Sequence, residues 1–140
     1  MKCKAFLDTN ILLDIAVPDR PMHEAAVELC NAVASGSIEA AICAGSLKDF
    51  YYVSRHGIGD DAARRRWIRW LMAMFEVEGL DSLICDGAER SDEPDFEDGI
   101  IRACAERWHA DYIVSRDVAA FARSSVPRVD TAQLLDRLYS

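Results

Sequence analysis

Four aspartates lie where predicted strands and helices meet, and carboxylates in such an arrangement can bind metal ions. These residues are Asp8, Asp49, Asp98 and Asp117. Carboxylates that are gathered around one point repel one another unless a cation lies between them. Mg²⁺ and Mn²⁺ prefer such hard oxygen ligands. The residues alone therefore favour a magnesium-dependent nuclease.

The hydrophobic pattern alternates short strand-like runs with longer helical ones, which is typical of a parallel sheet covered by helices. Strands are expected at residues 3–7, 38–43, 75–77, 111–115 and 126–129. Helices are expected at residues 10–17, 22–33, 45–55, from 59–61 through 74, from about 95, and at 118–123 and 131–139. The predicted fold class is α/β, a three-layer α/β/α sandwich with a central, mostly parallel sheet of four to five strands.

Two further expectations concern the second half of the chain. Residues 86–94 are polar and are expected to form a loop that ends where a helix begins at about residue 95. The buried face of that helix is expected to consist of Phe96, Ile100, Ala103 and Cys104.

The order of these elements predicts where the acidic side chains lie. In an open parallel sheet, ligands bind beyond the carboxyl ends of the strands. Asp8 follows the first strand, Asp49 lies in the helix after the second, and Asp117 follows the fourth. Asp98 lies one turn into the helix that leads to the fourth strand. The alternative is that these aspartates only cap helices or complement helix dipoles, but separate caps do not explain why they converge on one rim.

Composition places the chain among ordinary globular proteins. With 140 residues, of which 51% are hydrophobic and 29% charged, residues 1–140 are expected to form a single domain. The apolar runs are too short to span a bilayer, and the first residues do not resemble a signal peptide, so a cytoplasmic protein is expected. The five cysteines are odd in number and include no Cys-x-x-Cys pair, which favours free thiols.

The net charge of −8 is unusual for a protein that binds nucleic acid, because phosphate neutralisation supplies most non-specific affinity. Metal ions bound to the acids would remove part of this deficit. Arginine side chains form forks that suit phosphate groups. The candidate substrate-binding residues are Arg64, Arg65, Arg66, Arg69 and Arg116. The alternative for the first four is a solvated helix face.

Four segments of the chain resemble the PIN-domain family, and together they extend over nearly the whole sequence. They are Phe6-Leu7-Asp8-Thr9-Asn10-Ile11-Leu12-Leu13-Asp14, Ser46-Leu47-Lys48-Asp49-Phe50-Tyr51-Tyr52-Val53, Asp95-Phe96-Glu97-Asp98, and Ala110-Asp111-Tyr112-Ile113-Val114-Ser115-Arg116-Asp117 followed by Phe121. A single one of these segments is a weak signal. In this order and at this spacing, the four form a specific one.

The resemblance implies a metal-dependent endoribonuclease fold, most often seen as the VapC-like toxin of a bacterial type II toxin–antitoxin pair. It implies an RNA substrate, a cognate antitoxin, a homodimer, and one or two Mg²⁺ or Mn²⁺ ions. Asp8, Asp98 and Asp117 match the metal-site acids of the family, and Asn10 and Ser115 match its supporting polar positions.

The chain departs from the family pattern at Asp49, where the family usually has Glu. The side chain of Asp49 is about one methylene shorter, so it would bind a metal through water or leave the site weaker. Asp95 and Glu97 are nearby substitutes. The expected catalytic set is therefore Asp8, Asp49, Asp98 and Asp117, with Asp95 as an additional metal ligand.

Two alternative functions remain open from the sequence. The shortened Asp49 is compatible with a catalytically weak or inactive PIN-like scaffold that binds nucleic acid or protein. A haloacid-dehalogenase-like phosphatase also begins with an acid at the end of a strand, but Asp8-Thr9-Asn10 lacks the second aspartate of its Asp-x-Asp signature. That class also needs a lysine late in the chain, and the lysines here are Lys2, Lys4 and Lys48.

Overall fold

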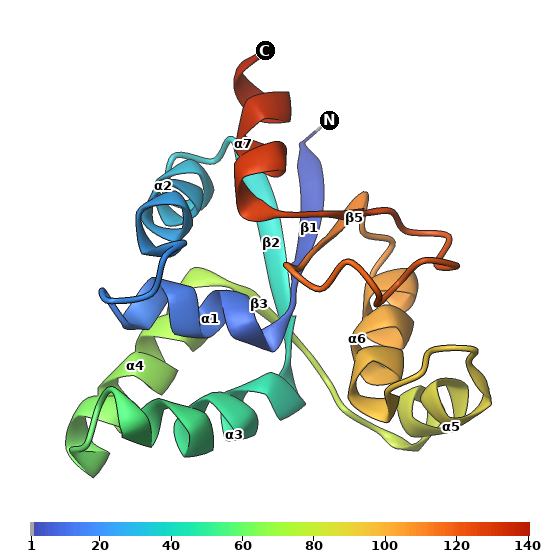
Figure 1. The fold of residues 1–140 in the computed structure, drawn as a ribbon, viewed down its shortest axis with the longest axis horizontal. Helices are drawn as coiled ribbons and strands as arrows, with labels where there is room; N and C mark the ends of the chain where they lie inside the picture. The colour runs from blue at the N-terminus through green and yellow to red at the C-terminus, as the bar shows by residue number, and fades with distance from the viewer. Residues whose placement is uncertain (1) are drawn as a thin grey trace.

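The centre of the protein is a five-stranded sheet in which every pair of neighbouring strands is parallel. A computed structural model describes residues 2–140 (Figure 1). The strands are β1 (Cys3–Leu7), β2 (Ile38–Cys43), β3 (Glu76–Glu78), β4 (Tyr112–Val114) and β5 (Arg128–Val129). Their order across the sheet is β3-β2-β1-β4-β5, so β1 lies at the centre and pairs with β2 and β4. The predicted fold class is confirmed.

Helices cover both faces of this sheet (Figure 1). They are α1 (Thr9–Ala16), α2 (His23–Ala34), α3 (Ala44–Val53), α4 (Asp61–Met74), α5 (Ser82–Arg90), α6 (Phe96–Arg107) and α7 (Thr131–Tyr139), with a short 3-10 helix, η1 (Ser54–His56), after α3. One hydrophobic core contains side chains of α1, α2, α3, α4 and α7. The other contains side chains of α5 and α6.

The central strand contributes to both cores because successive side chains of a strand point to opposite faces. Ala5 and Leu7 lie in the core under α1 and α2, and Phe6 lies in the core under α6. All three side chains are fully buried. Strands that are covered on both sides are usually continuous apolar runs, which explains Ala5-Phe6-Leu7 directly before Asp8, whereas Lys4 lies at the partly buried start of the strand.

The structure corrects the expectation of a loop at residues 86–94, because α5 covers residues up to Arg90. Asp81 caps this helix by accepting a hydrogen bond of 3.0 Å from the backbone N–H of Ile84. Only Ile84 and Ala88 are buried within α5. A buried stripe of two residues is too narrow to distinguish a helix from a polar loop by periodicity.

Two more expectations were wrong in the second half of the chain. Residues 118–123 form bends and turns instead of a helix, and Phe121 has a backbone φ of 68°. On α6 the expectation was wrong only in part. Cys104 is buried, and Ile100 and Ala103 are partly buried against the core, but Phe96 is 50% exposed. The other residues that α6 buries are Gly99, Ile101 and Ala105.

The five cysteines of the sequence are free thiols, as predicted. Between residues 2 and 140, none of the helices combines the length and the apolar character that crossing a membrane requires.

Candidate functional site

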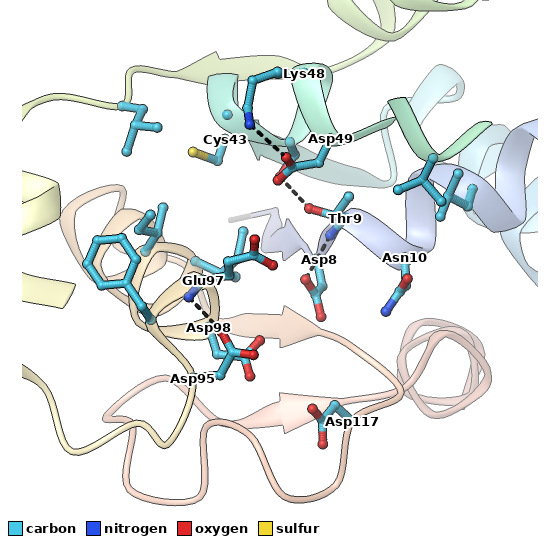
Figure 2. A pocket seen from close by; sticks show the side chains of 18 of the residues that line it. Asp8, Thr9, Asn10, Cys43, Lys48, Asp49, Asp95, Glu97, Asp98 and Asp117 are labelled. Carbon is cyan, nitrogen blue, oxygen red and sulfur yellow. Dashed lines mark hydrogen bonds and ion pairs between the residues drawn. The ribbon is translucent and has the colours of Figure 1, made fainter. Parts of the chain in front are cut away.

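A pocket of about 860 Å³ opens beyond the carboxyl ends of the central strands, and six carboxylate side chains line it. They are Asp8, Asp49, Asp95, Glu97, Asp98 and Asp117. Asn10 and Lys48 also line the pocket. Figure 2 shows these side chains converging from the end of β1, the segment after β4, the second turn of α3 and the start of α6. The four predicted aspartates are therefore neighbours in space.

Asp8 lies at the junction of β1 and α1 and is 7% exposed. Its Oδ1 accepts a hydrogen bond of 2.8 Å from the backbone N–H of Thr9, so it caps α1 as well as facing the pocket. Its Oδ2 accepts a hydrogen bond of 2.8 Å from Oγ of Ser115. Burial raises the pKa of Asp8, and these two hydrogen bonds oppose the rise. Capping therefore uses one oxygen and leaves the carboxylate at the pocket wall.

Asp98 has the most perturbed acid–base chemistry in the pocket. Its pKa is raised to about 7, first by burial and then by the negative charges of Asp8, Asp95, Asp117 and Glu93. Like charges disfavour ionisation, whereas a nearby cation favours it. The negative charges around Asp98 are therefore not fully offset by cationic side chains of the protein.

Asp117 lies on the segment between β4 and β5, residues 115–127, which we call the Asp117 loop. Its backbone N–H donates to Oγ of Ser115 at 3.1 Å. Its Oδ1 accepts hydrogen bonds from the backbone N–H groups of Ala119, at 3.0 Å, and Ala120, at 3.3 Å. Ser115 thus contacts both Asp8 and the backbone of Asp117, and it joins the two sides of the pocket.

Asp49 lies on α3, at the opposite wall from Asp117 (Figure 2). Its Oδ1 lies 3.2 Å from Nζ of Lys48. The start of α3 is tied to the start of α1 by a hydrogen bond of 2.8 Å from Oγ1 of Thr9 to Oγ of Ser46. This contact fixes the helix of Asp49 beside Asp8, although Asp49 itself is paired with a cationic side chain.

Asp95 and Glu97 line the same wall as Asp98. Asp95 caps α6, because its Oδ1 accepts a hydrogen bond of 2.7 Å from the backbone N–H of Glu97. The cap leaves the second oxygen of Asp95 available to the pocket. It also places three acids within the first four residues of this wall, which accounts for part of the rise in the pKa of Asp98.

The donor chemistry of the pocket fits a hard divalent cation. Six carboxylates line it, and Asn10 adds an amide oxygen. Within residues 2–140, however, no three His, Cys, Asp or Glu side chains are grouped closely enough to form a complete ligand set. Mg²⁺ commonly uses one or two carboxylates and keeps several water molecules, so a pocket of this width suits an ion that is bound partly through water.

The predicted substrate-binding arginines lie apart from the acids. Among residues 2–140, the pocket lining does not include any of the four arginines of α4. Arg64 packs over the ring of Tyr51 at 4.7 Å and donates to the carbonyl of Ile58. Arg65 pairs with Asp61 at 3.0 Å, and Arg66 and Arg69 are exposed. Arg116 lies beside Asp117 in the chain.

Arg116 contacts a buried acid on α1. Its Nη1 lies 3.4 Å from Oδ1 of Asp14, which is fully buried and also accepts a hydrogen bond of 2.7 Å from Nε of Arg20. The positive charge of Arg116 lowers the pKa of Asp8. Arg116 is therefore the predicted arginine that acts on the pocket electrostatically.

Sequence reasoning did not single out Lys48 as part of the pocket, nor Glu93 and Arg102 beside it. Lys48 precedes Asp49 at the start of a helix that follows a strand, and this position could have indicated it. Glu93 and Arg102 meet through the fold and are nine positions apart, at 3.0 Å. The helical spacing rules for i, i+3 and i, i+4 pairs do not reach that separation.

Comparison with known proteins finds one matching family model and several solved structures with a similar fold. A family model described as PIN domain matches residues 4–119. No curated protein matches the sequence significantly. Among solved structures, VapC20 from Mycobacterium tuberculosis, a Sarcin-Ricin loop cleaving toxin, is 16% identical, with a TM-score of 0.65 over 81% of this chain and 89% of that chain.

Two complexes are similar to a comparable degree. VapBC2 from Rickettsia felis, bound to a DNA fragment from its promoter, is 13% identical, with a TM-score of 0.67 over 91% of this chain and 98% of that chain. A toxin–antitoxin complex from Klebsiella pneumoniae is 19% identical, with a TM-score of 0.66 over 91% of this chain and 97% of that chain. At these identities the similarity is one of fold.

Proposed function

Because this chain belongs to the PIN-domain family, we propose that it is a metal-dependent endoribonuclease that hydrolyses RNA phosphodiester bonds as the toxin of a bacterial type II toxin–antitoxin pair. The observation that carries this proposal is the pocket in which Asp8, Asp98 and Asp117 meet. The pKa of Asp98 is raised to about 7 there, by burial and by its acidic neighbours. A divalent cation would offset the repulsion by these neighbours, which adds to the effect of burial.

Asp8, Asp98 and Asp117 would hold the ion, some of them through bound water molecules, with Asp49 or Asp95 as a further ligand. When bound, Mg²⁺ or Mn²⁺ would polarise the phosphodiester and make an attacking water more acidic. Ser115 and the backbone N–H of Thr9 orient the two oxygens of Asp8. Asp98 carries a proton on its carboxylate at low pH and releases it near neutrality. Asn10 supplies a polar group on the same wall.

The RNA would approach from the open side of the pocket. Lys48 lines it and is largely exposed, and Arg116 directly precedes Asp117 in the chain, with its partly exposed side chain beside Asp14. We assign these two cations to the phosphates next to the cleaved bond. Arg64, Arg65, Arg66 and Arg69 of α4 would contact more distant phosphates, because they lie outside the pocket. The net charge of −8 makes these local cations the main source of affinity for RNA.

The partners follow from the same proposal. The Klebsiella pneumoniae and Rickettsia felis proteins with this fold occur in toxin–antitoxin complexes, which supports a cognate antitoxin for this chain. A homodimer is proposed from the resemblance to the family.

The decisive experiment is cleavage of a single-stranded RNA in Mg²⁺ or Mn²⁺, with EDTA as the metal-free control. Asp8→Asn should abolish cleavage because it removes a ligand charge and keeps the side-chain volume. Asp86→Asn is the matched control, since Asp86 is an exposed acid on α5 that pairs with Arg90. Full activity of Asp8→Asn, or undiminished cleavage in EDTA, would refute the proposal.

The pairing of Asp49 with Lys48 favours one other candidate, a scaffold that has lost catalysis. In such a protein the acids would not bind a divalent ion. Calorimetric titration with Mn²⁺ separates the two functions: a nuclease should show a site that Asp8→Asn and Asp98→Asn remove, whereas a scaffold should show no heat of binding that depends on these residues.

A further inference from the structure

Arg102, on α6, is the centre of a network of ion pairs beside the pocket. Its side chain is 18% exposed. Its Nη1 lies 2.6 Å from Asp92 and 3.0 Å from Glu93, and its Nε lies 2.9 Å from Glu106. Its Nη2 donates a hydrogen bond of 3.0 Å to the backbone carbonyl of Arg123, in the Asp117 loop. Arg102 thus joins α6 to the loop that carries Asp117.

Glu93 completes this connection from the segment before α6. Its side chain is 3% exposed. Oε2 accepts from Arg102 at 3.0 Å, and Oε1 accepts a hydrogen bond of 2.8 Å from the backbone N–H of Phe121. A buried carboxylate is stable only when its charge is paired and its oxygens are hydrogen-bonded. Glu93 meets both conditions, and it does so by contacting the Asp117 loop.

Two consecutive N–H groups of that loop are held by two different acids. The N–H of Ala120 donates to Oδ1 of Asp117 at 3.3 Å, and the N–H of Phe121 donates to Glu93. Phe121 has a φ of 68°, a left-handed backbone conformation that is unfavourable for a residue with a side chain. The contact with Glu93 maintains this conformation. The adjacent peptide, whose Ala120 N–H donates to Asp117, therefore depends on the contact with Glu93.

The other end of the network is fixed to the helix of Asp98. Asp98 and Arg102 are four positions apart on α6, so they lie on the same side of the helix. Gly99 sits against α5 so closely that a Cβ there would lie 3.0 Å from the carbonyl oxygen of Ala88. The backbone of α6 therefore packs closely against α5 at this glycine. The network thus connects a loop that carries one site acid to a closely packed helix that carries another.

We propose that Glu93 and Arg102 are positioning residues that set the place of Asp117 relative to Asp98, and thereby the affinity of the pocket for a divalent cation. This inference rests on the proposed function, because it assumes that Asp98 and Asp117 share an ion. Neither residue contacts the ion. Partners that orient metal ligands typically change metal affinity by 10- to 100-fold when they are removed.

The test measures Mn²⁺ affinity of the full chain by calorimetry, without RNA. Glu93→Gln keeps the shape and one acceptor but loses the charge that faces Arg102. It should weaken Mn²⁺ binding about tenfold. Glu106→Gln is the matched control: it removes a charge from the same arginine, but Glu106 bonds to Arg102 within α6 and not to the Asp117 loop in residues 2–140. The Mn²⁺ affinity of Glu106→Gln should stay within about twofold of the wild-type value.

Glu93→Gln also removes a negative charge near the pocket, and this effect must be separated from positioning. The same substitution is therefore made in the Asp117→Asn background. If Glu93 acts through Asp117, the tenfold loss should shrink to about twofold or less there. A loss of equal size in both backgrounds would show a plain charge effect and overturn the inference, as would an unchanged Mn²⁺ affinity in Glu93→Gln.

If Glu93→Gln does not fold, hydrogen exchange in the unaltered protein provides a second test of the inference. In the unaltered protein, the amide of Phe121 should exchange more slowly than the exposed amides of the Asp117 loop; equal rates would overturn the inference. Arg102→Gln should weaken Mn²⁺ binding to a similar extent, and wild-type affinity in that variant would also overturn it. A wild-type chain that binds no Mn²⁺ refutes the proposed function and this inference together, whereas normal binding with an unaffected Glu93→Gln refutes this inference alone.

Discussion

Oγ of Ser115 donates a hydrogen bond of 2.8 Å to Oδ2 of Asp8, although the two residues are 107 positions apart. Ser115 is 1% exposed, and the bond lies between the ends of β4 and β1. It is the main hydrogen bond that opposes the effect of burial on the pKa of Asp8. The fold therefore uses a buried hydroxyl to offset part of the rise that burial causes in the pKa of Asp8.

Ser115→Ala should weaken metal binding about tenfold, because it frees the orientation of Asp8 and raises the pKa of Asp8 further. The free energy of unfolding should fall by about 1–2 kcal/mol from the loss of a buried hydrogen bond. Mn²⁺ calorimetry and urea denaturation measure the two effects. Ser35→Ala, which removes a hydroxyl that bonds within the end of α2, should leave metal affinity unchanged; equal affinity in Ser115→Ala would contradict the role of Ser115.

Asp98→Asn should stabilise the metal-free protein at pH 8. The pKa of Asp98 is raised from its ordinary value of 3.8 to about 7 in the folded state. Between these values the folded state binds more protons at this site than the unfolded state, so stability rises as pH falls from about 7 toward 4. Above pH 7 the ionised Asp98 is repelled by its neighbours, and Asn removes that repulsion.

The expected gain at pH 8 is about 1 kcal/mol, well below the full linkage value, because solvent screens this partly exposed side chain. Urea denaturation in EDTA at pH 4.5, 6 and 8 provides the measurement. The difference between variant and wild type should grow with pH. A difference that is constant across the three pH values would mean that Asp98 does not titrate in this range.

Asp49→Glu should keep or increase nuclease activity, because the longer side chain restores the reach of the residue that the family usually has. Glu could extend past the Lys48 ammonium group that lies 3.2 Å from Asp49. Asp49→Ala should weaken metal binding less than Asp8→Ala, since Asp49 is more exposed and already paired. If Asp49→Ala changed neither metal affinity nor cleavage rate, another acid of the pocket, such as Asp95 or Glu97, would complete the site.

The rim of acids was predictable from the sequence because it depends on two local facts. Short apolar runs predict the strands, and the position of an acid at the end of a run predicts its place at the carboxyl edge of a parallel sheet. Asp8 and Asp117 satisfy both conditions directly. Asp98 reaches the pocket because α6 begins at that edge before it runs back toward the start of β4.

The parts that were missed depend on contacts between distant residues. The conformation of residues 118–123 is set partly by Glu93, whose carboxylate accepts the Phe121 N–H from 28 positions away. Local propensity at Val118-Ala119-Ala120-Phe121 favours a helix, and it cannot predict that hydrogen bond. For α5, the sequence shows only Ile84 and Ala88 as buried positions, and its cap at Asp81 looked like part of a polar connection.

Reversing two arginines of α4, Arg65→Glu with Arg69→Glu, should raise KM for RNA. Both side chains are exposed, and they lie outside the pocket, so they can contact phosphates only beyond the cleaved bond. Each lost phosphate contact should flatten the dependence of log affinity on log salt concentration by about one unit. Metal affinity should not change, because α4 contributes no residue to the pocket lining within residues 2–140.

The matched control reverses two cations at the opposite end of the sheet, Lys2→Glu with Arg137→Glu. Lys2 precedes β1, and Arg137 donates to the hydroxyl of Tyr112 at the start of β4. Both pairs of substitutions change the net charge by the same amount, so a general electrostatic effect would alter KM equally in the two variants. A rise in KM confined to the α4 variant would place the RNA along α4. Unchanged KM and salt dependence in that variant would leave those arginines as a solvated helix face, with Lys48 and Arg116 as the cations that bind RNA.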